Sequence, residues 1–298
     1  MTEEHTPQIH VATVHMDSGY TDWAGIQHAF LSRHMRAPFS MYGFFESDPG
    51  EIAKHYRYAS WPRIRDHATK LNLLADIICF AAGSDDDWIV FIDGDAFPIG
   101  DVVGYLEAAL KSYPLVAVQR LENRGDIQPH PCFCATTVGF WKSIRGDWSK
   151  GHKWVNSEGM KVSDVGGALL GILLEKQLEW KPMLRTNRVD LHPLLFGIYG
   201  DMIYHHGAGF RQPVLRADHP AFGSGGPGRS TWERLVDLLF PPNRDALWLH
   251  RARMLLSPAT RRARAIVKEN EKLSLEVIAE MERNPNFFER FLGRTESP

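Results

Sequence analysis

Asp93, Gly94 and Asp95 have the residue types and spacing of a cation site. They follow the run WIVFI at 88–92, which is apolar at every position and predicts a strand buried on both faces. Ligands of open α/β sheets bind beyond the carboxyl ends of such strands. Ionised carboxylates are costly there unless they are paired or bind a metal. The pattern therefore predicts that Asp93 and Asp95 hold Mn²⁺ or Mg²⁺, with water and phosphate as further ligands; a solvated turn is the alternative.

A second segment whose residue types could bind a metal or a phosphate is HHGAGFR at 205–211. A histidine at a strand end can supply a nitrogen ligand, which Mn²⁺ tolerates better than Mg²⁺ does. Neighbouring residues on a strand point to opposite faces, so we expect only one of His205 and His206 to be a ligand, and we favour His205. Arg211 could clamp phosphate oxygens and stabilise a departing diphosphate. The alternative is a core histidine beside a glycine turn.

The elements that must position these residues begin with a β-α-β pattern. A strand at Ile9–His15, a helix at Trp23–His34 and a strand at Phe39–Phe45 favour a parallel sheet. Further expected helices and strands alternate along the chain: helices at 64–80, 101–111 and 165–178, and strands at 115–118, 138–141 and 202–206. We place a domain boundary in the linker rich in glycine and proline, with one domain at 1–228 and a helical extension at 229–298.

The stretch WIVFIDGDAFPI at 88–99 resembles the Asp-x-Asp strand of GT-A type glycosyltransferases. The resemblance implies a GT-A-like, Rossmann-like α/β fold, with a mixed, mostly parallel sheet flanked by helices. In that family the second aspartate binds the metal directly, and the first contacts the metal or the ribose. The resemblance therefore supports Asp95 as a direct metal ligand more strongly than it supports Asp93.

The late segment is similar to that of retaining, glycogenin-like members, in which a histidine precedes a lysine by six residues. His205 and Arg211 have this spacing, but arginine replaces lysine and Ala208 stands at the glycine position. The resemblance also implies roles for three other regions. Asp164, which is alternatively a helix N-cap, would be the general base of an inverting enzyme or would contact the donor sugar of a retaining one. The turn with Met16, Asp17, Ser18 and Tyr20 would contact base and ribose, and the helix with His67, Lys70 and Asn72 would reach the diphosphate or base.

The resemblance implies a metal-dependent glycosyltransferase, of the hexosyltransferase type, that moves a sugar from a nucleotide-diphosphate sugar to an acceptor hydroxyl. We favour a UDP-sugar as donor, a carbohydrate or glycolipid as acceptor, and a role in bacterial glycan or glycoconjugate synthesis. The alternatives are a non-catalytic protein that binds a nucleotide-sugar and a haloacid-dehalogenase-type phosphatase. The phosphatase motif belongs to the first strand of its domain and carries threonine or valine where this chain has Phe97.

The composition is that of an ordinary globular protein, with 298 residues and a formal net charge of -2. This charge argues against nucleic acid as a partner. The three cysteines form no disulfide framework, and we expect Cys132 and Cys134 to pack on one face of a strand. The polar N-terminus resembles no signal peptide, so a cytoplasmic location is expected.

The helical extension contains a basic stretch interleaved with apolar residues, at Arg251, Arg253, Arg261, Arg262, Arg264 and Lys268. One interpretation is an amphipathic surface that meets anionic lipid at the inner membrane face, which would suit a lipid-linked acceptor. The other is a solvated helix face that covers the domain or a dimer partner.

Overall fold

A computed structural model describes residues 7–16, 21–209, 231–240, 248, 252 and 255–293. The chain forms two compact units: Met1–Phe210 with Asn284–Pro298, and Arg211–Arg283. The predicted boundary after residue 228 lies outside the described residues.

The first unit is built on a seven-stranded sheet in the order β10-β6-β7-β4-β1-β2-β3. All its strand pairs are parallel except those of β7, which runs antiparallel to both β4 and β6. This mixed, mostly parallel sheet confirms the predicted fold class. Its strands are β1 (Ile9–Val14), β2 (Phe39–Phe44), β3 (Tyr56–Ser60), β4 (Trp88–Asp93), β6 (Leu115–Val118), β7 (His130–Thr137) and β10 (Lys181–Met183).

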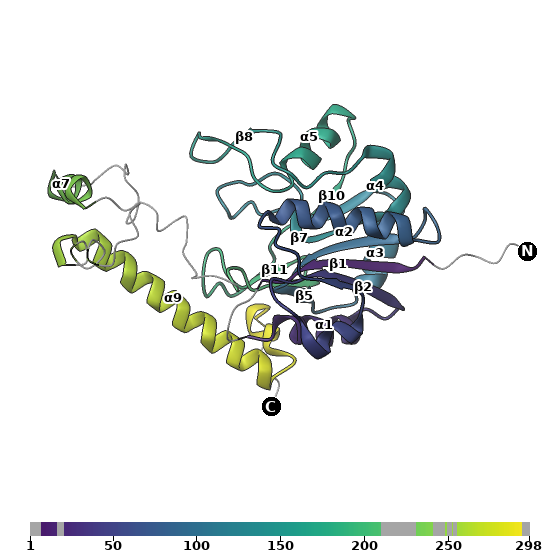
Figure 1. Ribbon diagram of the computed structural model, residues 1–298, viewed down its shortest axis with the longest axis horizontal. Coiled ribbons are helices and arrows are strands. Elements are labelled where there is room, and N and C mark those ends of the chain that lie inside the picture. The colour runs from purple at the N-terminus through teal and green to yellow at the C-terminus, as the bar shows by residue number, and fades with distance from the viewer. Residues whose placement is uncertain are drawn as a thin grey trace, which may run out of the picture. The chain divides into compact units, whose positions relative to one another are not determined.

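Helices cover both faces of this sheet, as Figure 1 shows, and β4 illustrates why its strands are apolar throughout. Val90 and Ile92 pack in a core cluster with residues of α1 and α3, whereas Ile89 and Phe91 pack with α2, α4 and α5 on the other face. The strand therefore has no solvent-facing side until Asp93. The helices are α1 (Trp23–His34), α2 (His67–Ala81), α3 (Val102–Ala109), α4 (Val138–Ile144) and α5 (Gly167–Glu175).

A small antiparallel sheet lies directly after the Asp-Gly-Asp turn. Its strands lie side by side in the order β11 (Gly197–Tyr199), β12 (Ile203–His205) and β5 (Ala96–Pro98). The register of β12 on β5 places His205 opposite Ala96, so a residue from late in the chain is brought beside Asp95. The remaining elements of this unit are η1 (Gly50–His55), β8 (Trp154–Val155), β9 (Lys161–Val162) and η3 (Phe287–Phe291).

The structure corrects two expectations about local structure. Residues 138–141 belong to helix α4 and not to a strand, because the Thr137 hydroxyl accepts the Phe140 N–H and starts a helix there. The strand expected in this region is β7, which precedes it. In β7 the pairing with β6 jumps from Cys134 to His130. This irregularity places Cys132 and Cys134 in different core clusters, on opposite faces of the sheet.

The predicted helical tail contains α7 (Thr231–Leu239) and α9 (Pro258–Arg283) in the second unit. The segment η3 belongs to the first unit, where Phe287 packs against Phe97 and Tyr204. Within the described part of the chain, no helix has the length and apolar character needed to cross a membrane.

Candidate metal centre and its surroundings

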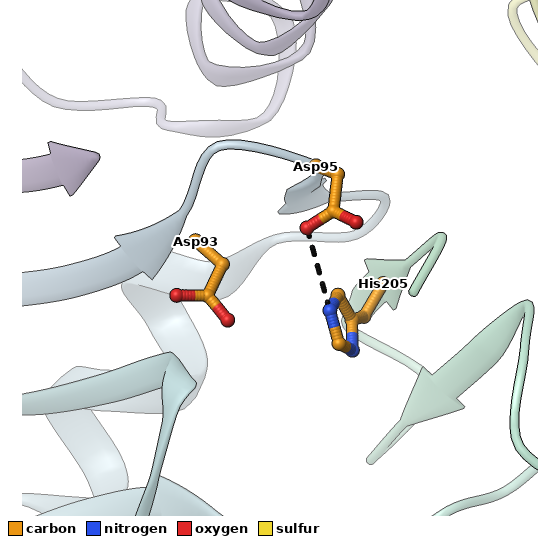
Figure 2. Close-up of side chains that lie close together, drawn as sticks. All are labelled: Asp93, Asp95 and His205. Carbon is orange, nitrogen blue, oxygen red and sulfur yellow. Dashed lines mark ion pairs between the residues drawn. The ribbon is translucent and has the colours of Figure 1, made fainter. Parts of the chain in front are cut away.

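Asp93, Asp95 and His205 come together beyond the carboxyl end of β4. Each offers a ligand atom, and these atoms all lie within 4.8 Å of one another (Figure 2). The Nε2 atom of His205 lies 3.4 Å from Oδ1 of Asp95. Two carboxylates and one imidazole form a donor set that suits Mn²⁺ or Mg²⁺. The residues present therefore fit the predicted cation.

The Asp95 carboxylate is buried, and neighbouring hydrogen-bond donors and His205 stabilise its charge. Its Oδ2 accepts the Gly209 N–H at 3.0 Å, and its backbone carbonyl accepts the His206 N–H at 3.0 Å. Burial opposes ionisation, yet His205 and the Gly209 hydrogen bond hold the pKa of Asp95 well below its usual value. Asp95 is therefore a carboxylate, which is the form that a cation needs.

The second carboxylate, Asp93, is oriented by His67 at the start of α2. The Nε2 atom of His67 lies 3.1 Å from Oδ1 of Asp93. Burial works against both charged forms, but this contact lowers the pKa of Asp93 and raises that of His67. The helix starts at His67 because the Asp66 side chain accepts the Thr69 N–H. His67 therefore orients the Asp93 carboxylate; its expected contact with the diphosphate or base stays a prediction.

Gln27 and Trp23 of α1 hold the backbone around Asp93 and Asp95 by hydrogen bonds. The buried Gln27 amide donates to the carbonyl oxygens of Asp93 and Ala96, both at 2.8 Å. The Trp23 indole N–H donates to the Gly209 carbonyl at 3.1 Å. Sequence reasoning missed both residues, because each looks like an ordinary member of an amphipathic helix.

His206 occupies a different environment from His205. It is fully buried, with Nδ1 3.0 Å from the Tyr204 hydroxyl and its ring between Trp23 and Phe196. Burial lowers the pKa of His206 to about 3. Its ring therefore packs in the core as a neutral group, and only His205 belongs to the group that can hold a cation.

His130, the first residue of β7, also borders the site, and sequence reasoning missed it. Its ring centroid lies 6.1 Å from that of His205. Its Nδ1 accepts the Cys132 N–H at 3.1 Å, and burial and the charge of Arg120 keep its pKa well below the usual value. The neutral ring therefore carries its proton on Nε2 and is a hydrogen-bond donor. The sequence carries no signal for His130, because only the antiparallel pairing of β7 with β4 brings the first residue of β7 to the edge where β4 ends.

A cleft opens beside the carboxyl ends of β1 and β2. The last residue of β1, Val14, pairs with Asp93 of β4. Met16 lines the cleft, together with His15, Trp23, Phe45 and Glu46. The His15 ring stacks on Phe45, with ring centroids 5.1 Å apart, and its Nε2 lies 2.9 Å from the Tyr56 hydroxyl. The other expected contacts of this region, Asp17, Ser18 and Tyr20, and the expected phosphate clamp Arg211 lie outside the described residues.

Lys70, Asn72 and Asp164 lie in three different settings. Lys70 is buried one turn after His67, and its charge acts against protonation of that histidine. The Asn72 amide donates to Asp147 at 2.7 Å and accepts the Trp148 N–H at 2.9 Å, so its side chain joins α2 to the loop after α4.

Asp164 lies just before α5, where its Oδ1 accepts the Val165 N–H at 2.9 Å and its carbonyl oxygen accepts the Gly167 N–H at 2.9 Å. The N-cap position itself belongs to Gly166, which has a φ of 86°. A Cβ atom on Gly166 would collide with the Pro129 carbonyl. The turn with Asp164 therefore lies against the residue before His130.

No family model matches the sequence. No curated protein matches it either. Among solved structures, the chain is similar to a protein of Desulfovibrio desulfuricans G20 assigned as a nucleotide-diphospho-sugar transferase, with 11% identity over 59% of this chain and 79% of that one and a TM-score of 0.39. It is also similar to the glycosyltransferase GlyE of Streptococcus pneumoniae TIGR4, with 14% identity over 59% of this chain and 45% of GlyE and a TM-score of 0.38. A third similar structure is S. aureus TarS in complex with UDP, with 10% identity over 48% of this chain and 50% of that chain and a TM-score of 0.36.

Proposed function

We propose that this protein is a metal-dependent glycosyltransferase that uses a nucleotide-diphosphate sugar, with a UDP-sugar favoured. The observation that carries the proposal is the convergence of Asp93, Asp95 and His205 at the carboxyl edge of the sheet, where the cleft lined by Met16 opens. Nucleotides bind at this edge in open α/β sheets. A cation held there would lie beside a cleft that can take the base and ribose.

Asp95 and His205 are the proposed direct ligands of Mn²⁺ or Mg²⁺, and Asp93 is the third. A bound divalent cation supplies Lewis-acid stabilisation of the leaving diphosphate. The protein orients the ligands through hydrogen bonds: His67 orients Asp93, Gly209 orients Asp95, and Gln27 holds the turn between them. The Nε2–H of His130 is a donor at the same edge, suited to an oxygen of the diphosphate or of the donor sugar.

In the reaction, the bond from the anomeric carbon to the diphosphate oxygen breaks, and a bond to the acceptor hydroxyl oxygen forms. If the enzyme inverts, Asp164 takes the hydroxyl proton. If it retains, Asp164 orients the donor sugar and the departing diphosphate takes the proton. Arg211 adds positive charge at the diphosphate. We propose a carbohydrate or glycolipid acceptor and a cytoplasmic location.

The test is release of nucleoside diphosphate from a panel of sugar nucleotides with Mn²⁺, with and without EDTA. We expect Mn²⁺-dependent release with at least one donor, and a loss of at least 100-fold in Asp95→Asn. The matched control is Asp86→Asn, which changes an exposed aspartate in the loop before β4. Absence of release with every donor, together with tight Mn²⁺-dependent UDP binding, would instead identify a non-catalytic nucleotide-sugar-binding protein. Metal-dependent hydrolysis of phosphate esters, without sugar transfer, would favour the phosphatase alternative.

A further inference from the structure

The second unit carries an exposed apolar face on helix α7. Trp232, Leu235, Leu238 and Leu239 recur at a spacing that places them on one side of the helix. All four are exposed, with Leu238 at 76% and Leu239 at 59%, whereas Val236 is buried at 1%. The helix therefore packs through Val236 and leaves its larger apolar residues uncovered.

A run of positive charge lies in the first turns of α9. Arg261, Arg262, Arg264 and Lys268 are exposed, and the sequence between Trp248 and Lys268 contains no acidic residue. This stretch therefore carries a net positive charge that an anionic surface would neutralise.

Hydrogen bonds connect the apolar and basic parts within this unit. The Trp232 indole N–H donates to the Leu256 carbonyl at 2.7 Å, and the Arg261 guanidinium donates to the Leu255 carbonyl at 2.9 Å. Leu255 is itself 74% exposed. One short segment thus links α7 to the cations of α9 and adds another apolar side chain between them.

We propose that this surface binds a lipid bilayer that contains anionic lipid, and we call it the lipid-binding face. It consists of Trp232, Leu235, Leu238, Leu239, Leu255, Arg261, Arg262, Arg264 and Lys268. Exposed tryptophan and leucine beside arginine and lysine are the composition of helices that lie in the membrane interface. A two-fold dimer through the same face would bring like charges from the two copies together, whereas anionic headgroups neutralise them. The proposal does not depend on the proposed transferase activity.

The experiment is sedimentation of the full-length protein with vesicles of phosphatidylcholine alone and of phosphatidylcholine with phosphatidylglycerol at a ratio of 3:1. We expect binding to the anionic vesicles at 0.1 M salt, at least 10-fold weaker binding to the neutral ones, and release in 1 M salt. Arg262→Gln, Arg264→Gln and Lys268→Gln in one chain should weaken binding on the order of 100-fold. Leu238→Ser with Leu239→Ser should weaken it at least 10-fold.

Two controls match these variants. Lys150→Gln, Lys153→Gln and Lys176→Gln remove the same charge from exposed positions of the first unit, and Phe80→Ser removes an apolar side chain that is 93% exposed there. Both controls should bind as the parent does, and all chains should show the same circular dichroism. Absence of binding, equal binding to both vesicle types, or equal losses in variants and controls would overturn the proposal. A dimer in solution that Leu238→Ser with Leu239→Ser dissociates, without vesicle binding, would assign the face to self-association instead.

Discussion

The Oδ2 atom of Asp95 accepts a hydrogen bond of 3.0 Å from the N–H of Gly209, although 114 residues separate the two. The Oδ1 atom of the same carboxylate faces His205 at 3.4 Å. The late segment of the chain therefore does two things at once. It supplies His205, one of the proposed ligands, and it sets the direction of the carboxylate of Asp95, another proposed ligand.

A substitution at Gly209 tests whether the late segment sets the position of the Asp95 carboxylate. A Cβ atom at this position would lie 2.8 Å from both the Asp95 Cβ and a ring carbon of Trp23. Because both neighbours are buried, Gly209→Ala should displace the Asp95 carboxylate. We expect Mn²⁺ affinity to fall about 10- to 100-fold, as for other disruptions around metal ligands, measured by calorimetric titration. Gly83→Ala is the control, since its nearest atom lies 3.9 Å away; equal Mn²⁺ affinities in the two variants would contradict this role of the late segment.

The His67 prediction concerns the orientation of Asp93. Removing the imidazole in His67→Ala leaves Asp93 without its 3.1 Å partner, so its carboxylate is no longer held toward the cation. We expect Mn²⁺ affinity to fall about 10-fold or more, with a smaller loss in His67→Gln if the amide replaces the hydrogen bond. The exposed His152→Gln serves as control. Unchanged affinity in His67→Ala would show that Asp93 needs no support from α2.

The sequence predicted the local parts of this architecture well. The elements β1, α1, β2 and β4 follow from hydrophobic periodicity, and the position of Asp93 and Asp95 follows from the end of β4. The pairing that places His205 opposite Ala96 could not be predicted, because it joins two three-residue strands more than 100 residues apart. The roles of Gln27 and His67 depend on helix packing against the turn, which periodicity alone does not report.

The two neighbouring histidines should respond differently to substitution. His205→Gln removes a proposed metal ligand that faces the two carboxylates, so we expect Mn²⁺ affinity to fall about 10-fold or more, with a smaller change in the free energy of unfolding than His206→Gln gives. His206→Gln places a differently shaped amide between Trp23 and Phe196, so we expect a loss of about 1–3 kcal/mol in that free energy. Urea denaturation and Mn²⁺ titration of both variants provide the comparison. The reverse pattern would show that His206 is the ligand.

His15 makes stability depend on pH. Burial lowers its pKa to about 3 from 6.5, so between these values the unfolded chain binds more protons than the folded one. Stability is therefore fully present above pH 6.5 and is lost as the pH falls toward 3. At pH 5 this one residue should cost about 2 kcal/mol relative to pH 7.5. Urea denaturation of metal-free protein at both values should show a smaller pH effect in His15→Asn than in the parent, and equal effects would refute the assignment.

The most direct test of the central claim is anomalous diffraction from crystals grown with Mn²⁺ and UDP. The geometry predicts one manganese peak between Asp93, Asp95 and His205, about 2.1 Å from its oxygen ligands as is usual for small divalent cations, with the nucleotide base in the cleft lined by Met16. A peak coordinated by other residues, or UDP bound away from this cleft, would contradict the account.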